Sequence, residues 1–284
     1  MSQRSSPWWA FWYSKGSYLL VILLVAVTII LSTPQISQGR SWFDLLRQSI
    51  QVIQLSNLSD NQEVQFGQQI NQTLLKQGKV KISRNEAINR YITKIGQRLA
   101  QSSDRPNIPY RFQVVNNNSI NAFATMGGFV YVHTGLIKKV SNEAELASVI
   151  AHEIGHIVGR HAIENMKKTA ITQGLLTAAG LDSQSFVQLG VQLVYNLPNS
   201  RSAELEADQI GLQNLEQAGY APIGMLSFME KLLKYSSAAP EFLSTHPATG
   251  DRIEALKASI DPATANKGDG LNEKAYSTKI RALL

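Results

Sequence analysis

Apolar residues gather first in one long uncharged run near the start of the chain. Residues 18–31 read YLLVILLVAVTIIL and contain no charged side chain. With the neighbouring small and hydroxyl residues, segment 17–34 would be long enough as a helix to cross about 27–30 Å of hydrocarbon. Aromatic residues are frequent in the preceding segment 1–16, as is typical of a membrane interface. The pattern predicts one N-terminal transmembrane helix.

A cleaved signal sequence is the competing interpretation of this run. Its length suits a signal sequence, but Ser32, Thr33 and Pro34 do not form the small-x-small pattern of a cleavage site. We therefore favour an uncleaved anchor. Both interpretations export the rest of the chain, and the basic residues Arg4 and Lys15 before the run favour a cytoplasmic N-terminus.

Helical periodicity dominates the rest of the chain and is interrupted once by strand-like segments. Apolar residues three and four positions apart, or helix-capping spacing, predict helices in several places. These segments are 35–56, 58–77, 84–101, 142–167 and 202–214. Alternating or β-forming residues predict three short strands. They are residues 110–115, 122–125 and 129–133.

Strands that follow one another between groups of helices predict an α+β fold, mostly helical with a small mixed or antiparallel sheet. The globular domain is expected over residues 57–260. Segment 35–56 would link it to the anchor, either at the membrane surface or packed on the domain. The polar residues 261–284 are predicted to be a loosely held tail.

Composition removes several classes of function. Only 17% of the 284 residues are charged and 44% are hydrophobic, the reverse of a disordered chain. The absence of cysteine excludes disulfides, thiol catalysis, iron–sulfur clusters and cysteine zinc sites. The net charge of +6 comes without a dense basic run, so it gives no support for nucleic-acid binding. Histidine and carboxylate remain as ligands for a metal.

Two histidines have the spacing of a metal site. His152, Glu153 and His156 form an HExxH sequence inside the helix predicted over 142–167. Residues four apart lie on one face of a helix, so both imidazoles can reach one zinc ion. Glu153 could then act as general base toward a metal-bound water. Apolar neighbours indicate a buried helix, in which histidines need partners.

A third histidine follows but does not fit the ligand pattern. On a continuing helix, His161 would lie about 180° around the axis from His152. The metzincin pattern needs its third histidine at position 162, where this chain has alanine. We interpret His161 as structural.

A later helix offers a better third ligand. Glu204 and Asp208 lie four residues apart on one face of the helix predicted over 202–214, whereas Glu206 points to another side. This arrangement resembles the gluzincins, in which a carboxylate completes the zinc site. We predict Glu204 as metal ligand and Asp208 as the partner of a ligand's second nitrogen.

Taken together, these motifs resemble metallopeptidase family forty-eight, which contains HtpX-like membrane proteases, CAAX endopeptidases and periplasmic BepA-like and LoiP-like enzymes. HEIGH at 152–156 and SRSAELEAD at 200–208 carry the resemblance, with weaker support from segments 121–132 and 245–253. It covers about residues 59–256. Met126 stands where the family often has proline. A single hydrophobic span argues for the short members rather than the polytopic ones.

The resemblance implies further roles. An extended substrate would bind as an added strand. The residues implied for this are Asn121, Ala122, Phe123 and Ala124, although Asn121 could also be a turn residue. His246 would stabilise the oxyanion or occupy the metal's open position in a resting enzyme. Arg201 and Arg252 would pair with Asp208 or Glu204.

The sequence therefore predicts a membrane-anchored zinc endopeptidase that acts on unfolded or misassembled envelope proteins, most simply on the periplasmic side of a bacterial inner membrane. Two alternatives remain: a chaperone-like binding protein with a structural or latent zinc site, and an anchored scaffold with a decayed active site. The apolar stretch between His156 and Glu204 is either a lid over the cleft or a set of core helices.

Overall fold

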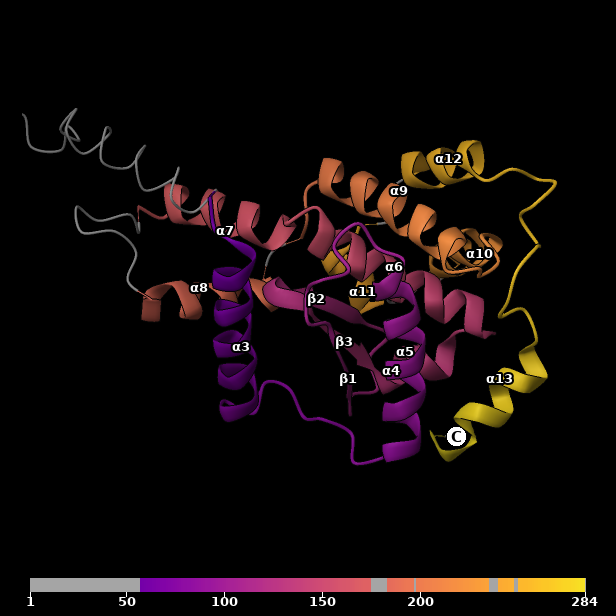
Figure 1. The fold of residues 1–284 in the computed structure, drawn as a ribbon, viewed down its shortest axis with the longest axis horizontal. Coiled ribbons are helices and arrows are strands. Elements are labelled where there is room, and N and C mark those ends of the chain that lie inside the picture. Colours follow the sequence, from indigo (N-terminus) through magenta and orange to yellow (C-terminus); the bar gives the residue numbers. More distant parts are fainter. Residues whose placement is uncertain (1–56, 175–182, 197, 235–239, 248–249, 284) are drawn as a thin grey trace, which may run out of the picture. The chain divides into compact units, whose positions relative to one another are not determined.

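The computed structural model describes residues 57–174, 183–196, 198–234, 240–247 and 250–283. The predicted anchor and the predicted helix over 35–56 lie outside these residues. Within the described ranges, no helix combines the length and apolar character that a membrane crossing requires. The predicted α+β organisation is confirmed for this part, since many helices surround one small sheet (Figure 1).

The sheet is mixed and has three strands. They are β1 (Arg111–Val115), β2 (Ala122–Thr125) and β3 (Phe129–His133). The order is β1-β3-β2, with β1 parallel and β2 antiparallel to β3. β2 therefore lies at an edge. The 3-10 turn η1 (Met126–Gly128) joins β2 to β3, and its two glycines have positive φ, which L side chains rarely adopt.

Among the described residues, two helices precede the sheet, as predicted for this part of the chain. α3 (Asp60–Lys76) is capped by Ser59 in a complete capping box, and α4 (Glu86–Gln101) is capped by Asn85. α4 places its apolar face on β1, while α3 contacts η1. These contacts fix the position of the edge strand relative to the helices that follow.

The helices after the sheet carry the candidate site. They are α5 (Thr134–Lys139), α6 (Glu143–Val158), α7 (His161–Thr172), α8 (Ser183–Asn196), α9 (Arg201–Gln217), α10 (Ile223–Leu233), α11 (Glu241–Thr245), α12 (Gly250–Ser259) and α13 (Glu273–Ile280), followed by η2 (Arg281–Leu283). α9 and α10 both pack along α6, as Figure 1 shows.

α6 and α9 approach each other closely because glycines lie at their contact. A Cβ atom on Gly155 would come within 2.6 Å of the Ala207 carbonyl oxygen. A Cβ on Gly211 would lie 3.0 Å from the His152 backbone. Only glycine permits backbones so close, and the result is that α9 presents its side chains directly to the HExxH helix.

The helix predicted over 142–167 is in fact two helices. α6 ends at Val158, and Arg160 adopts the left-handed conformation with φ 55° before α7 begins at His161. A left-handed residue cannot continue a helix, so the chain changes direction here. The extrapolated position of His161 was therefore wrong.

The capping box at Asn142 and Glu145 forms only in part. The Asn142 side chain accepts a hydrogen bond from the Glu145 backbone N–H at 3.0 Å. The Glu145 carboxylate accepts instead from the Ser141 N–H at 2.8 Å and pairs with Lys231. The ion pair with Lys231 ties α10 to the start of α6.

The prediction of a loosely held C-terminal tail is wrong. Tyr276 and Ile280 on α13 are buried in the main core, and the Tyr276 hydroxyl donates to the Ile137 carbonyl at 2.6 Å. Lys279 also pairs with Glu143 at the start of α6. The segment is polar in overall composition, but Tyr276 and Ile280 lie four residues apart and so share one face of α13. Such a pair is enough to bury one face of a short helix.

Of the two interpretations of the apolar stretch between His156 and Glu204, the described residues 183–196 agree with core helices and not with a lid. Phe186, Leu189 and Val191 of α8 are buried in a cluster shared with α3, and Phe186 packs on Phe66 with ring centroids 4.3 Å apart. α8 therefore forms a fixed wall beside the sheet edge.

Candidate metal centre

Four side chains from three parts of the chain meet at one point. His152 and His156 come from α6, Glu204 from the first turn of α9, and His246 from the residue that ends α11. One ligand atom from each lies within 4.8 Å of all the others, and all four residues are buried. The sequence-predicted ligands His152, His156 and Glu204 are thus brought together, with His246 beside them.

The distances fit a metal ion. The two Nε2 atoms of His152 and His156 lie 3.1 Å apart, and each is 3.3–3.4 Å from an oxygen of Glu204. His246 Nδ1 lies 3.1 Å from Glu204 Oε1. Ligands at about 2.0–2.1 Å from a tetrahedral ion would be spaced roughly 3.3–3.4 Å from one another. Three imidazoles and a carboxylate are a donor set that suits zinc.

Glu153 lies next to these four residues with nothing to satisfy its carboxylate. The residue is fully buried, and neither oxygen accepts a hydrogen bond from the part of the chain that the structure describes. Its nearest charged-group contact is His246 Nε2, 3.5 Å from Oε1. Burial raises the pKa of the Glu153 carboxyl. A buried carboxylate without a hydrogen bond, beside a metal-binding group, suits a general base for a water molecule.

Asp208 and Arg252 hold the ligands in place. Asp208 Oδ1 lies 2.9 Å from His152 Nδ1, one turn along α9 from Glu204. Arg252 on α12 donates two hydrogen bonds to Asp208, at 2.6 and 2.7 Å, and its third nitrogen lies 2.6 Å from Glu204 Oε2. This buried arginine pairs with both carboxylates and fixes their direction.

Arg201 does not share this role. Its side chain is 66% exposed and pairs with Asp251 on α12. Arg201 is the first residue of α9, and from this end of the helix its long side chain reaches outward to α12. The predicted pairing of Arg201 with Asp208 or Glu204 is therefore wrong.

His161 makes a contact that sequence reasoning missed. Its Nδ1 lies 2.8 Å from His156 Nδ1, and its Nε2 lies 3.3 Å from Glu206 Oε2. The break after α6 makes this possible, since Gly159 leaves room where a Cβ would come within 2.6 Å of the His161 ring. Gly159 was the sequence signal for the end of α6, because glycine commonly follows the last turn of a helix.

The neighbours set the protonation of the two α6 histidines in opposite directions. Burial lowers the pKa of His152, but the carboxylates of Asp208 and Glu204 outweigh it and raise the value to about 9. Burial and the charge on His152 together lower the pKa of His156 to about 3. The carboxylates beside His152 thus favour its protonated form, and burial favours the neutral form of His156.

The predicted substrate-binding strand runs beside this group. The Asn121 carbonyl accepts a hydrogen bond from the His133 N–H at 3.0 Å, and the Asn121 side chain donates to Glu241 at 3.1 Å. Because antiparallel pairs alternate, the backbone groups of Ala122 and Ala124 then point away from β3. Ala124 is half-buried and lines the cleft described next, whereas Ala122 is fully buried and does not line it. Phe123 stacks on Tyr131 with centroids 4.5 Å apart.

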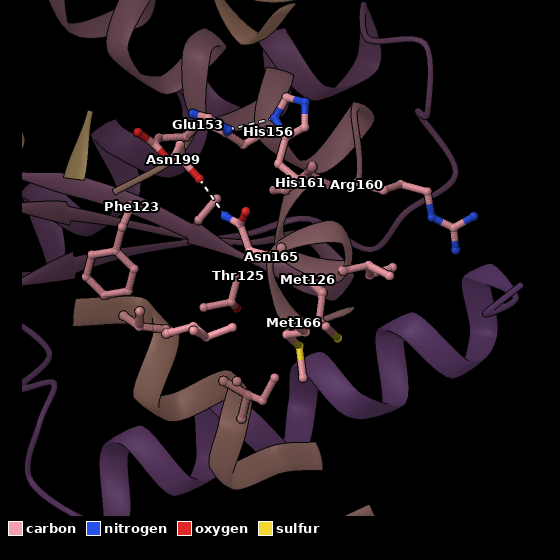
Figure 2. A pocket seen from close by; sticks show the side chains of 18 of the residues that line it. Phe123, Thr125, Met126, Glu153, His156, Arg160, His161, Asn165, Met166 and Asn199 are labelled. Atoms are coloured by element: carbon pink, nitrogen blue, oxygen red, sulfur yellow. Dashed lines mark hydrogen bonds between the residues drawn. The ribbon is translucent and has the colours of Figure 1, made fainter. Parts of the chain in front are cut away.

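A cleft with about 770 Å³ of space, open to solvent, follows this edge (Figure 2). Glu153, His156 and His246 line it together with residues 123–126 of β2 and η1. Peptide-binding groups and the candidate metal group thus open onto the same space.

The chain is similar to known peptidases. The model of Peptidase family M48 matches residues 86–260. The Beta-barrel assembly-enhancing protease of Escherichia coli K12 is 35% identical over 214 residues, 70% of this chain and 44% of that protein. The Mitochondrial metalloendopeptidase OMA1 of Arabidopsis thaliana is 38% identical over 161 residues, 55% of this chain and 33% of that protein.

The chain thus spans less than half the length of these relatives. The match to the family model includes α4, the sheet, the HExxH helix, α9 and α12. It covers more than half of the chain, and so the chain belongs to Peptidase family M48.

Proposed function

We propose that this chain is a membrane-anchored zinc endopeptidase that hydrolyses peptide bonds of unfolded or misassembled envelope proteins. The observation that carries the proposal is the buried group of His152, His156, Glu204 and His246, beside which the Glu153 carboxylate makes no hydrogen bond among the described residues. Residues 57–260 would form the protease domain, and residues 17–34 the anchor.

The residues divide the work of hydrolysis among them. His152, His156 and Glu204 would hold a zinc ion, which when bound would supply Lewis-acid chemistry toward the peptide carbonyl and the attacking water. Glu153 takes the proton from the attacking water and delivers it to the leaving amine. Burial raises the pKa of the Glu153 carboxyl, which favours the uptake of a proton by this group.

Substrate would bind along the free edge of β2. The outward backbone groups of Ala124, which lines the cleft, can pair with an extended peptide, and only an unfolded or flexible protein offers such a segment. Names of the relatives agree with such substrates, since one group is called Beta-barrel assembly-enhancing protease. With the long apolar run at residues 18–31, this supports an exported domain at the periplasmic face of an inner membrane.

The direct test replaces Glu153 with glutamine. Glu153→Gln keeps the shape of the side chain but removes the base, so the rate of casein cleavage should fall by about 10²–10⁴-fold. Glu254→Gln on the exposed face of α12 is the matched control and should keep the full rate. A Glu153→Gln protein that folds, binds zinc and cleaves casein at the parent rate would end the proposal.

A second candidate function has one observation in its favour. His246 gives the group a fourth protein ligand, and four protein ligands are typical of structural zinc sites. A chaperone-like protein would hold unfolded chains at the β2 edge with such a closed site. It would cleave nothing, and it would suppress aggregation of an unfolded protein equally well before and after the Glu153→Gln substitution.

A further inference from the structure

The cleft extends well beyond the candidate metal group. In Figure 2, Glu153 and His156 lie toward the top of the cavity, and Met126 and Met166 lie toward the bottom. The walls at this second end share one property, since all are apolar side chains from α3, η1, α7 and α8. We call this set the apolar subsite; it comprises Ile70, Met126, Ile163, Met166, Leu193 and Val194.

Helices α3 and α8 pack closely at the apolar subsite. Ile70 on α3 and Gly190 on α8 both line the cleft, and a Cβ on Gly190 would come within 2.4 Å of Ile70 Cδ1. This close-packed part of the wall limits the space left for an occupant, so the subsite can select by size.

Two of the polar groups along this part of the cleft have partners, whereas the buried Thr125 hydroxyl makes no hydrogen bond among the described residues. Glu63 pairs with Arg105 at 2.8 Å and with Arg160 at 3.2 Å. Asn165 donates to Asn199 at 2.9 Å. With these groups engaged, an apolar occupant gains the burial of its surface, whereas a charged one would lose its hydration without compensation.

A peptide paired with β2 would point every second side chain into this cleft, because side chains alternate along a strand. We propose that the apolar subsite binds one large aliphatic or aromatic side chain of the substrate, adjacent to the bond that is cleaved. This inference rests on the proposed peptidase function. It identifies the preferred substrates as chains whose apolar residues are exposed, which is the state of an unfolded protein.

The test maps the bonds that the full-length, zinc-loaded chain cleaves in casein and in a peptide library. At one of the two positions that flank the cleaved bond, Leu, Met and Phe should be preferred over Ser and Asp by at least about tenfold. An equal distribution of residues at both flanking positions overturns the inference.

Variants of the wall provide a matched comparison. Val194 is half-buried and lines the subsite, so Val194→Trp fills it with little effect on the core. Cleavage next to Leu and Phe should fall about tenfold or more while cleavage next to Ala persists. Ile171→Trp, at a 40% exposed position of α7 outside the cleft, should change neither. Ala162→Leu, at another half-buried wall position, should repeat the effect of Val194→Trp.

A measurement of peptide binding distinguishes a failure of the subsite inference from a failure of the proposed peptidase function. Fluorescence anisotropy with the Glu153→Gln protein compares two labelled peptides that differ by Leu or Ser at the selected position. Tighter binding of the Leu peptide with no cleavage by the parent protein would support the subsite and contradict the peptidase. Cleavage by the parent with equal binding of both peptides would support the peptidase and contradict the subsite.

Discussion

At the scale of single residues, the site depends on buried polar groups that satisfy one another. Arg252 is only 1% exposed, yet it contacts both Asp208 and Glu204, so the carboxylates are held without access to water. Such contacts orient the groups that face the metal. Two further buried histidines make contacts of this kind: His246 lies against Glu204, and His161 lies against His156.

His246 is expected to be a ligand of the resting enzyme. Its Nδ1 lies 3.2 Å from His152 Nε2, within the ligand group and not out in the cleft. His246→Ala should therefore free the fourth position, raise the basal rate of peptide cleavage and weaken zinc binding. Cleavage assays and chelator competition measure the two effects. A His246→Ala protein with lost activity and full zinc affinity would assign His246 to transition-state stabilisation instead.

His161 is expected to position His156. His156 Nε2 faces the ligand group, so its Nδ1 must carry the proton and donate to His161 Nδ1, while Glu206 accepts from the far nitrogen of His161. His161→Phe should weaken zinc binding by about 10–100-fold, as measured by chelator competition. His161→Gln keeps an acceptor and should recover part of this loss. Equal zinc affinity of the parent and His161→Phe would show that the contact has no positioning role.

At the scale of elements, the close contact of α6 and α9 creates the centre. Periodicity and spacing predicted both helices and placed Glu204 and Asp208 on one face. They could not predict that His161 turns back toward His156, because that depends on a left-handed residue at Arg160. Nor could they exclude Arg201 or find the packing of Tyr276, since both depend on which helices become neighbours.

The glycine at the contact gives a prediction for these two helices. Gly155→Ala would place a Cβ 2.6 Å from the Ala207 carbonyl oxygen, so α9 must move. Overpacking of this kind should lower the free energy of unfolding by about 1–3 kcal/mol in urea titrations, and zinc binding should weaken as Glu204 shifts. Gly250→Ala is the control, since no atom of a described residue other than its chain neighbours lies within 4 Å of its Cβ position. Equal stability and zinc affinity of Gly155→Ala and the parent would contradict this role of the contact.

At the scale of the whole molecule, distant segments converge on one helix. The start of α6 is tied to α13 through Glu143 and Lys279, and to α10 through Glu145 and Lys231. Its end carries the HExxH residues. Local patterns predicted the helical domain with its small sheet, but a segment judged polar by composition turned out to pack against the core. The pattern of hydrophobic residues within a segment cannot predict contacts between segments that are far apart in the sequence.

A single zinc ion at this site is expected to enable peptide hydrolysis, and every role assigned to the surrounding residues depends on it. The most direct measurement strips the metal from the purified full chain with a chelator and then adds zinc in steps while casein cleavage is followed. We predict no cleavage by the stripped protein, which should keep its helical content, and full recovery at one zinc per chain. Cleavage that continues at the parent rate in the stripped protein, or that stays absent after zinc is bound, would contradict the claim.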